Sequence, residues 1–282
     1  MNRIARRNMV NNLMLTLTGL CAVITSSALV LILGFLVING WRSLSLDFFT
    51  KLPLSAGELG GGMANAIVGS GILILIAAVI GIPVGFLGGI YLAEFGGKAF
   101  SMLVRYTADL LNGVPSIVIG IFAWTIVVVK MHHFSAWAGG FALSMMMVPI
   151  GLRATEQFLR AVPDSLREGS LALGASKTRT IMNVVVPAAR QGIVTGMILG
   201  VARIAGETAP LLFTSFNNQF WASNLSEPTA SLPVMIYTHA ISPYDDWHRQ
   251  AWAAGLVLLM LVLIANIACR WVLSRGMAAQ RG

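Results

Sequence analysis

Long stretches without a charged residue constrain this chain more than any other feature. Lipid cannot satisfy open backbone polar groups, and a helix of roughly 20 apolar residues crosses the hydrocarbon core of a bilayer. The apolar runs here are continuous and do not alternate, which favours helices over a β-barrel. We therefore predict an all-α, polytopic membrane helical bundle. Five runs contain no Asp, Glu, Lys or Arg: residues 8–41, 59–93, 110–129, 134–152 and 250–269.

A sixth apolar run differs from the others because it contains two charges. Residues 191–216 are long enough to cross a bilayer and include Arg203 and Glu207. Composition supports the membrane assignment: 56% of the 282 residues are hydrophobic and 11% are charged, whereas soluble domains carry about 25% charged residues. We predict about six transmembrane helices, near residues 13–38, 66–93, 109–129, 136–152, 191–214 and 250–271.

The distribution of Lys and Arg among the loops predicts the orientation in the membrane. If the N-terminus is cytoplasmic, 14 of the 19 Lys and Arg residues fall on the inner side, 4 fall on the outer side, and Arg203 lies within a helix. Cytoplasmic loops carry an excess of positive charge. Both termini are therefore expected inside, with an uncleaved first helix. The net charge of +8 then reflects topology, and no nucleic-acid binding is expected.

The two outer loops are long, at residues 39–65 and 215–249. The second is rich in Asn, Ser and Pro and contains the segment LPVMIYTHA. We expect this segment to form a short helix at the membrane interface. Two interpretations of the loop stay open: it is a packed cap, or it is a docking surface for an external partner.

The inner loop at residues 153–190 has the signals of two short helices joined at a glycine. Ser165 with Glu168 three residues later is the pattern of a capping box, and Gly174 is typical of a helix stop. Pro187 suits the start of the next helix. The loop is interpreted either as a lid on the bundle or as a lever that another protein moves.

Nucleotide, metal and catalytic motifs are absent from the sequence. The segment GSLALGASKT resembles a phosphate-binding P-loop, but Ala175 and Ser176 separate its second Gly from the Lys that must follow directly. The four histidines lack metal-ligand spacing, and the Ser-nucleophile and zinc-protease motifs do not occur. We expect no cofactor, no metal and no enzymatic reaction in this chain, so any ATP would be bound by another subunit.

One face of the fifth predicted helix combines small residues with the two charges. At 100° per residue, the face holds Gly192, Gly196, Gly200, Arg203 and Glu207. Small residues four apart allow close helix packing, and charges within a membrane turn away from lipid. Two interpretations remain. The charges pair and stabilise the bundle, or the arginine offers its planar donors to a passing oxyanion while the glutamate neutralises it between passages.

Arg153 is a second candidate for the same role. It lies at the inner end of the fourth predicted helix. The simpler interpretation is a positive-inside anchor whose long side chain reaches toward the interface.

The inner loop also resembles the EAA motif of permeases from binding-protein-dependent ABC importers. That pattern is E-A-A, three residues, Gly, nine residues, a branched apolar residue, one residue, an apolar residue and Pro. Gly169 and Ser170 replace the two alanines, and the spacing is intact. The matching positions are Glu168, Gly174, Val184, Val186 and Pro187. From about residue 60 onward, GGGMANAIVGSG, VPSIVIG, ARIAGETAPLLFT and NQFW resemble the PstA-type permeases of phosphate-specific ABC transporters.

This resemblance implies a type I ABC-importer permease architecture in a prokaryotic plasma (inner) membrane. Residues 1–60 would form the tail, first helix and outer loop, and residues 61–282 the permease core. The chain would form half of a phosphate pore with a PstC-type permease, and an extracytoplasmic phosphate-binding protein would deliver phosphate. Two copies of a cytoplasmic ATPase that binds ATP-Mg would dock on the coupling loop, with Ser165, Glu168, Gly174 and Pro187. Phosphate contact would fall to Arg203, Glu207 and Arg153.

Other functions stay open from the residues themselves. The same architecture carries other oxyanions, such as sulfate or molybdate. An ion-coupled carrier or channel is a further alternative, although no clear internal repeat supports it.

Overall fold

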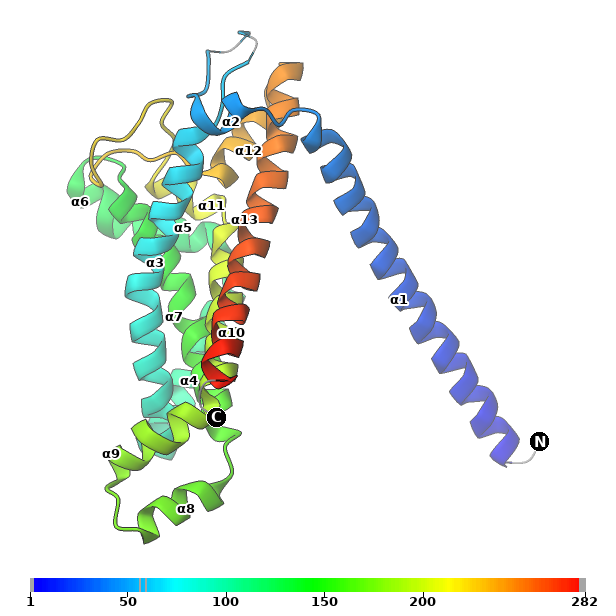
Figure 1. The fold of residues 1–282 in the computed structure, drawn as a ribbon, viewed down its shortest axis with the longest axis vertical. Helices are drawn as coiled ribbons and strands as arrows, with labels where there is room; N and C mark the ends of the chain where they lie inside the picture. The colour runs from blue at the N-terminus through cyan, green and yellow to red at the C-terminus, as the bar shows by residue number, and fades with distance from the viewer. Residues whose placement is uncertain (1–2, 56, 59, 279–282) are drawn as a thin grey trace.

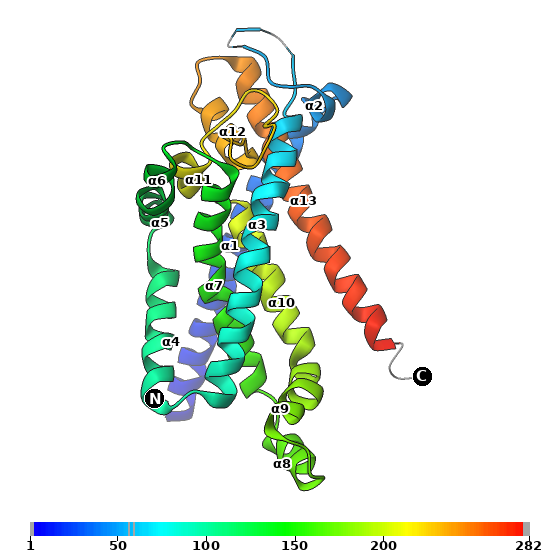
Figure 2. The same cartoon turned by 90° about the vertical axis from the view of Figure 1, so that its left-hand side faces the viewer.

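The computed structural model describes residues 3–55, 57–58 and 60–278, and within them every regular element is helical (Figures 1 and 2). The longer helices are α1 (Arg3–Trp41), α3 (Ala64–Ile90), α4 (Lys98–Gly113), α7 (Ala136–Arg160), α10 (Val186–Ala205) and α13 (Asp245–Ala278). The shorter helices are α2 (Leu46–Thr50), α5 (Ser116–Ala123), α6 (Val129–Met131), α8 (Asp164–Ala172), α9 (Lys177–Thr180), α11 (Ala209–Thr214) and α12 (Leu232–Ala240). Three π turns extend or join them: η1 (Tyr91–Phe95), η2 (Trp124–Val128) and η3 (Ile181–Val185).

Several of these helices have the length and composition of membrane spans, in agreement with an all-α membrane bundle. Among the described residues, four qualify: Arg6–Trp41, Ala64–Phe95, Lys177–Ala205 and Asp245–Trp271. A bent pair, Lys98–Gly113 with Ser116–Met131, makes a fifth if it is one span. The predicted segment 136–152 lies in α7, which is not among them, and the last turns of α7 carry Arg153, Glu156 and Arg160. The count of six therefore stays a prediction.

The centre of the bundle is α7, which packs against α3, α10, α4 and α5. Glycines let α3 approach it closely, because a Cβ at Gly81 would lie 2.7 Å from the side chain of Met147 and one at Gly85 would lie 3.0 Å from backbone atoms of α7. Such small-residue contacts replace the hydrophobic driving force that helices lack within lipid. The α3–α7 pair is thus the rigid frame of the molecule.

The third predicted helix, 109–129, is wrong as a single straight element. The chain breaks at Val114, and α4 and the α5–α6 segment lie at 102° to each other. Pro115 is the cause: it has no backbone N–H, and it disfavours helical backbone at the residue before it. Val114 accordingly has ψ 132°.

The fifth predicted helix, 191–214, is also two helices. α10 ends at Ala205 with Gly206 as its C-cap, and α11 begins at Ala209 and packs against α5. At its other end, α10 is continuous through η3 with α9, so the segment Lys177–Ala205 is one helical rod. Pro187 lies at the junction, where the wider π turn accommodates its missing N–H.

The loop between α7 and α10 has two short helices, as predicted, with different boundaries. The capping box at Ser165 and Glu168 is wrong, because α8 begins at Asp164 with Pro163 as its N-cap and no side-chain cap bond. The glycine stop is confirmed: Gly174 has φ +82° and donates to Leu171 O, in the left-handed conformation that glycine adopts without strain. The second short helix, α9, is the tip of the α10 rod.

The end of the bundle opposite α8 is covered by packed loop segments. The predicted short helix is confirmed as α12, which packs on α13 and α3, with Leu232, Val234 and Met235 fully buried. In contrast, α1 extends away from the bundle (Figure 1) and contacts α13 near Gly40, whose Cβ would lie 2.8 Å from Trp252 O.

Candidate functional site

Arg203 lies on the open side of α10, where it is exposed. Contacts of α10 with α7 follow the row Gly192, Gly196 and Gly200, where a Cβ would meet Phe158, Ala154 and Met147 respectively. Each four-residue step along such a row advances about 40° around the helix. The next member is Ile204, which is buried, so Arg203 is about 100° away from the contact line and is exposed.

Of the two interpretations of Arg203 and Glu207, the structure does not show the one in which the two charges pair. Glu207 follows the end of α10, and its N–H donates to Ile204 O at 3.2 Å. The two residues therefore do not stand four apart on one helix, and no ion pair joins them. The guanidinium is left facing outward with its donors available, next to the exposed Leu199 one turn away.

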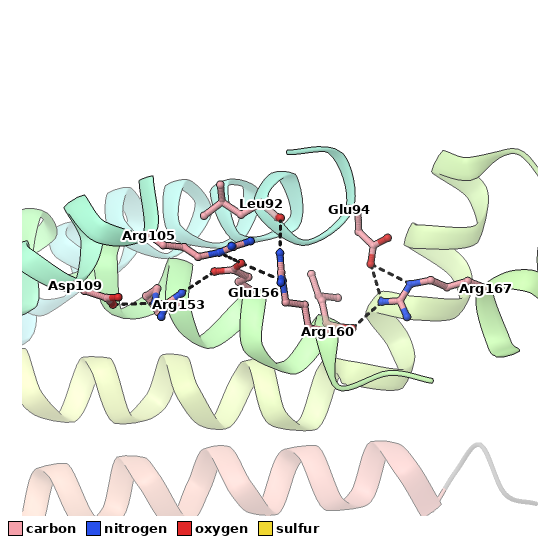
Figure 3. A network of polar contacts seen from close by, with 9 residues as sticks. Leu92, Glu94, Arg105, Asp109, Arg153, Glu156, Arg160 and Arg167 are labelled. Atoms are coloured by element: carbon pink, nitrogen blue, oxygen red, sulfur yellow. Dashed lines mark hydrogen bonds and ion pairs between the residues drawn. The ribbon is translucent and has the colours of Figure 1, made fainter. Parts of the chain in front are cut away.

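A second charged cluster lies between α4 and α7, with Glu156 at its centre (Figure 3). The Glu156 side chain is 3% exposed and accepts from three arginines. Arg105 of α4 contacts Oε1, Arg160 contacts Oε1 at 3.1 Å, and Arg153 contacts Oε2 at 3.0 Å. Arg153 also contacts Asp109 Oδ1 at 2.9 Å. The cluster holds α4 against α7 and carries one net positive charge.

This geometry changes how Arg153 is interpreted and adds a residue that the sequence did not indicate. Arg153 is engaged on both sides by carboxylates, whereas Arg203 has no carboxylate within ion-pair distance among the described residues. Glu156 escaped notice because its partner Arg105 is 51 positions away. A weak signal existed, since Glu156 has arginines three residues before it and four residues after it on one helix, a spacing that lets oppositely charged side chains pair.

The third feature is α8, which projects from the end of the bundle (Figure 1). None of its residues is buried, and Leu171 and Leu173 are exposed, the latter at 90%. Ser165, Glu168 and Gly174 are exposed with them. A short helix that presents leucines and a glutamate away from its own bundle is suited to a protein partner.

The cap at the opposite end contains a buried histidine. His239 of α12 is 3% exposed and stacks on Trp247, with ring centroids 4.3 Å apart. Burial lowers the pKa of His239 to about 4, and the nearby charge of Asp246 offsets part of this shift. The ring is therefore neutral near pH 7. Among the described residues, no three His, Cys, Asp or Glu side chains gather as a metal site.

The helical bundle, the outward-facing arginine and the projecting α8 define a membrane permease component that works with other proteins. Residues 81–275 match the family described as the binding-protein-dependent transport system inner membrane component, and the chain belongs to this family. It is thus a multi-pass membrane permease component of an ABC transporter.

Several similar relatives carry the name phosphate transport system permease protein PstA. The Yersinia pestis protein is 50% identical over 248 residues, which cover 88% of this chain and 84% of that protein. The Haemophilus influenzae protein is 44% identical over 261 residues, 92% of each chain. A Methanocaldococcus jannaschii protein with the same name, qualified as probable, is 37% identical over 214 residues, 76% of each chain.

Solved structures share the fold at low sequence identity. A chain of the inward-facing MetNI methionine ABC transporter has a TM-score of 0.57 at 19% identity and covers 75% of this chain and 92% of that one. A chain of a bacterial ABC transporter involved in the import of the acidic polysaccharide alginate has a TM-score of 0.61 at 16% identity, covering 95% and 97%. At these identities the likeness describes the architecture alone.

Proposed function

We propose that this chain is the transmembrane permease subunit of an ATP-driven importer of inorganic phosphate. The similarity along most of the chain to proteins named for phosphate transport carries the proposal. Arg203 supplies the chemistry: an unpaired guanidinium on an open helix face offers planar, permanently charged donors to an oxyanion. Glu207 and Arg153 flank the pathway, and Arg153 is already engaged by its two carboxylates.

The chain supplies half of the pore, and a homologous PstC-type permease supplies the other half beside Arg203. Two copies of a separate cytoplasmic ATPase hold ATP-Mg, and one docks on the exposed leucines and Glu168 of α8. This chain itself needs no cofactor. An extracytoplasmic phosphate-binding protein docks at the opposite end. The Lys and Arg bias supports α8 and both termini facing the cytoplasm, in the prokaryotic inner membrane.

The test is phosphate uptake by the complete importer reconstituted in vesicles. Arg203→Ala should reduce uptake by at least 100-fold, the loss of a charge-assisted contact with phosphate of about 3 kcal/mol, while assembly with the ATPase survives. Arg7→Ala removes an exposed arginine of α1, which extends away from the bundle, and serves as the matched control. Normal uptake by Arg203→Ala would refute the role of Arg203.

The same vesicles discriminate among oxyanions. Labelled sulfate and molybdate are offered in place of phosphate, each with the binding protein present. Uptake of phosphate alone supports the proposal, and preferential uptake of another oxyanion assigns the chain to the alternative importer.

A further inference from the structure

The π turn η1 at the end of α3 is held by cations from three different elements, two of which, Arg160 and Arg167, are shown in Figure 3. Arg160 of α7 donates to Leu92 O at 3.5 Å. Arg167 of α8 donates to Glu94 Oε1 from Nη2 at 2.8 Å and from Nε at 3.3 Å. Lys177 of α9 donates to Glu94 O at 2.6 Å and lies 4.5 Å from the ring centroid of Phe95.

Helix-end physics explains why cations gather there. The last four carbonyls of a helix have no partner within it, and the end carries a partial negative charge. The side chain of Glu94 adds a full negative charge and is only 8% exposed, with Arg167 18% exposed. Removing one partner of a pair this shielded from solvent strongly destabilises the folded chain, because the other charge is left buried and unpaired. The contact is therefore a firm attachment.

Arg167 is also the main attachment of α8 to the rest of the chain. Apart from Glu94, it donates to Leu159 O at 2.8 Å and to Val162 O at 2.6 Å, both at the end of α7. No residue of α8 is buried, and its other contacts are with η3 and α9, where Ser170 shares one hydrogen bond with Thr180. Arg167 is therefore the side chain through which a displacement of α8 acts directly on η1 and on the end of α7.

We propose that the Arg167–Glu94 pair is the joint through which displacement of α8 reaches α3. Glu94 lies outside the coupling loop, and we assign it as a positioning residue of the transport cycle. Because α3 is the principal packing partner of α7, the joint moves the α3–α7 frame together with α8. The inference rests on the proposed function, since an ATPase has to move α8.

The first test measures the joint in a complex whose Arg167–Glu94 pair is intact. Spin labels are attached at Ala172→Cys on α8 and Leu87→Cys on α3, in a background with Cys21→Ser and Cys269→Ser. A second sample pairs Ala172→Cys with Leu261→Cys on α13. We expect ATP to change the α8–α13 distance and to leave the α8–α3 distance constant. A nucleotide-dependent α8–α3 distance overturns the joint, and so does a constant distance in both samples, since nothing is then displaced.

The second test breaks the pair. Glu94→Gln should preserve assembly and ATP hydrolysis and lower the phosphate moved per ATP by about 2- to 30-fold, the range of residues that carry coupling between sites. Its α8–α3 distance should become sensitive to ATP. Asp164→Asn is the matched control: Asp164 also contacts Arg167, at 3.1 Å, but it belongs to α8 and links no second element.

The outcomes separate the two proposals. An unchanged phosphate-to-ATP ratio in Glu94→Gln overturns the joint. An unmutated importer that moves no phosphate overturns the proposed substrate, while the label distances, which need only nucleotide, still decide the joint. If Glu94→Gln fails to assemble, the distances in the complex whose pair is intact decide it alone.

Discussion

At the scale of single residues, the polar clusters of this chain differ in how fully their charges are engaged. Glu156 is surrounded by arginines, and Glu94 is paired with Arg167. Arg203 has no such partner among the described residues. The presence of an oppositely charged partner therefore distinguishes the structural charges of Glu156 and Glu94 from Arg203, which is open to a ligand or a second subunit.

Glu156→Gln should destabilise the purified chain by about 2–3 kcal/mol, because the arginines around the site would lose their shared carboxylate while partial exposure moderates the loss. Thermal unfolding in mild detergent measures the effect. Asp109→Asn is the control. Its carboxylate is 52% exposed, so its loss should cost less than about 1 kcal/mol. An equal loss of stability in the two variants would contradict the role of Glu156 as the buried centre of the cluster.

His239 should make the outer cap sensitive to acid. The unfolded imidazole takes up a proton near pH 6.5, whereas the buried ring does so only near pH 4. The stability that the neutral His239 ring contributes is fully present above pH 6.5. It is lost as the pH drops toward 4, and the loss amounts to about 3 kcal/mol at most. Hydrogen exchange of α12 amides measures it. The difference between the wild type and His239→Gln should follow this window, whereas His132→Gln should track the wild type throughout.

At the scale of elements, close contacts at glycines decide how α10 lies on α7. A Cβ at Gly196 would fall 2.5 Å from Ala154 Cβ, and an alanine cannot move its Cβ without moving its helix. Gly196→Ala should therefore destabilise the bundle by about 1–3 kcal/mol. Gly71→Ala, where nothing lies within 4 Å, should be neutral or slightly stabilising. The two unfolding temperatures, compared in one detergent, test the contact.

The elements that sequence patterns predicted well are those with a local cause. Apolar runs located α1, α3 and α13, and Gly174 located the end of α8. The break at Val114 also has a local cause in Pro115, but an apolar run masks it. Contacts between residues far apart in the sequence were harder to predict, such as that of Arg105 with Glu156 over 51 positions. The row of α10 residues that contacts α7 also turns around the helix, and this turn places Arg203 outside the packing face.

At the scale of the whole molecule, the charge bias and the two ends of the bundle predict one orientation. In a background with Cys21→Ser and Cys269→Ser, Leu46→Cys and Leu173→Cys place thiols at opposite ends, on side chains that are 80% and 90% exposed. A membrane-impermeant maleimide should label Leu46→Cys in intact spheroplasts and Leu173→Cys only after permeabilisation. The reverse pattern would invert the topology and place α8 out of reach of a cytoplasmic ATPase.

The contact between α1 and α13 joins the first helix of the chain to the last. During synthesis, α1 enters the bilayer before the residues that pack against Gly40 have been translated. α1 therefore lacks this contact until Leu256 has been translated. Truncation before Leu256 would remove the residues that pack against Gly40 and leave α1 without this contact to the bundle.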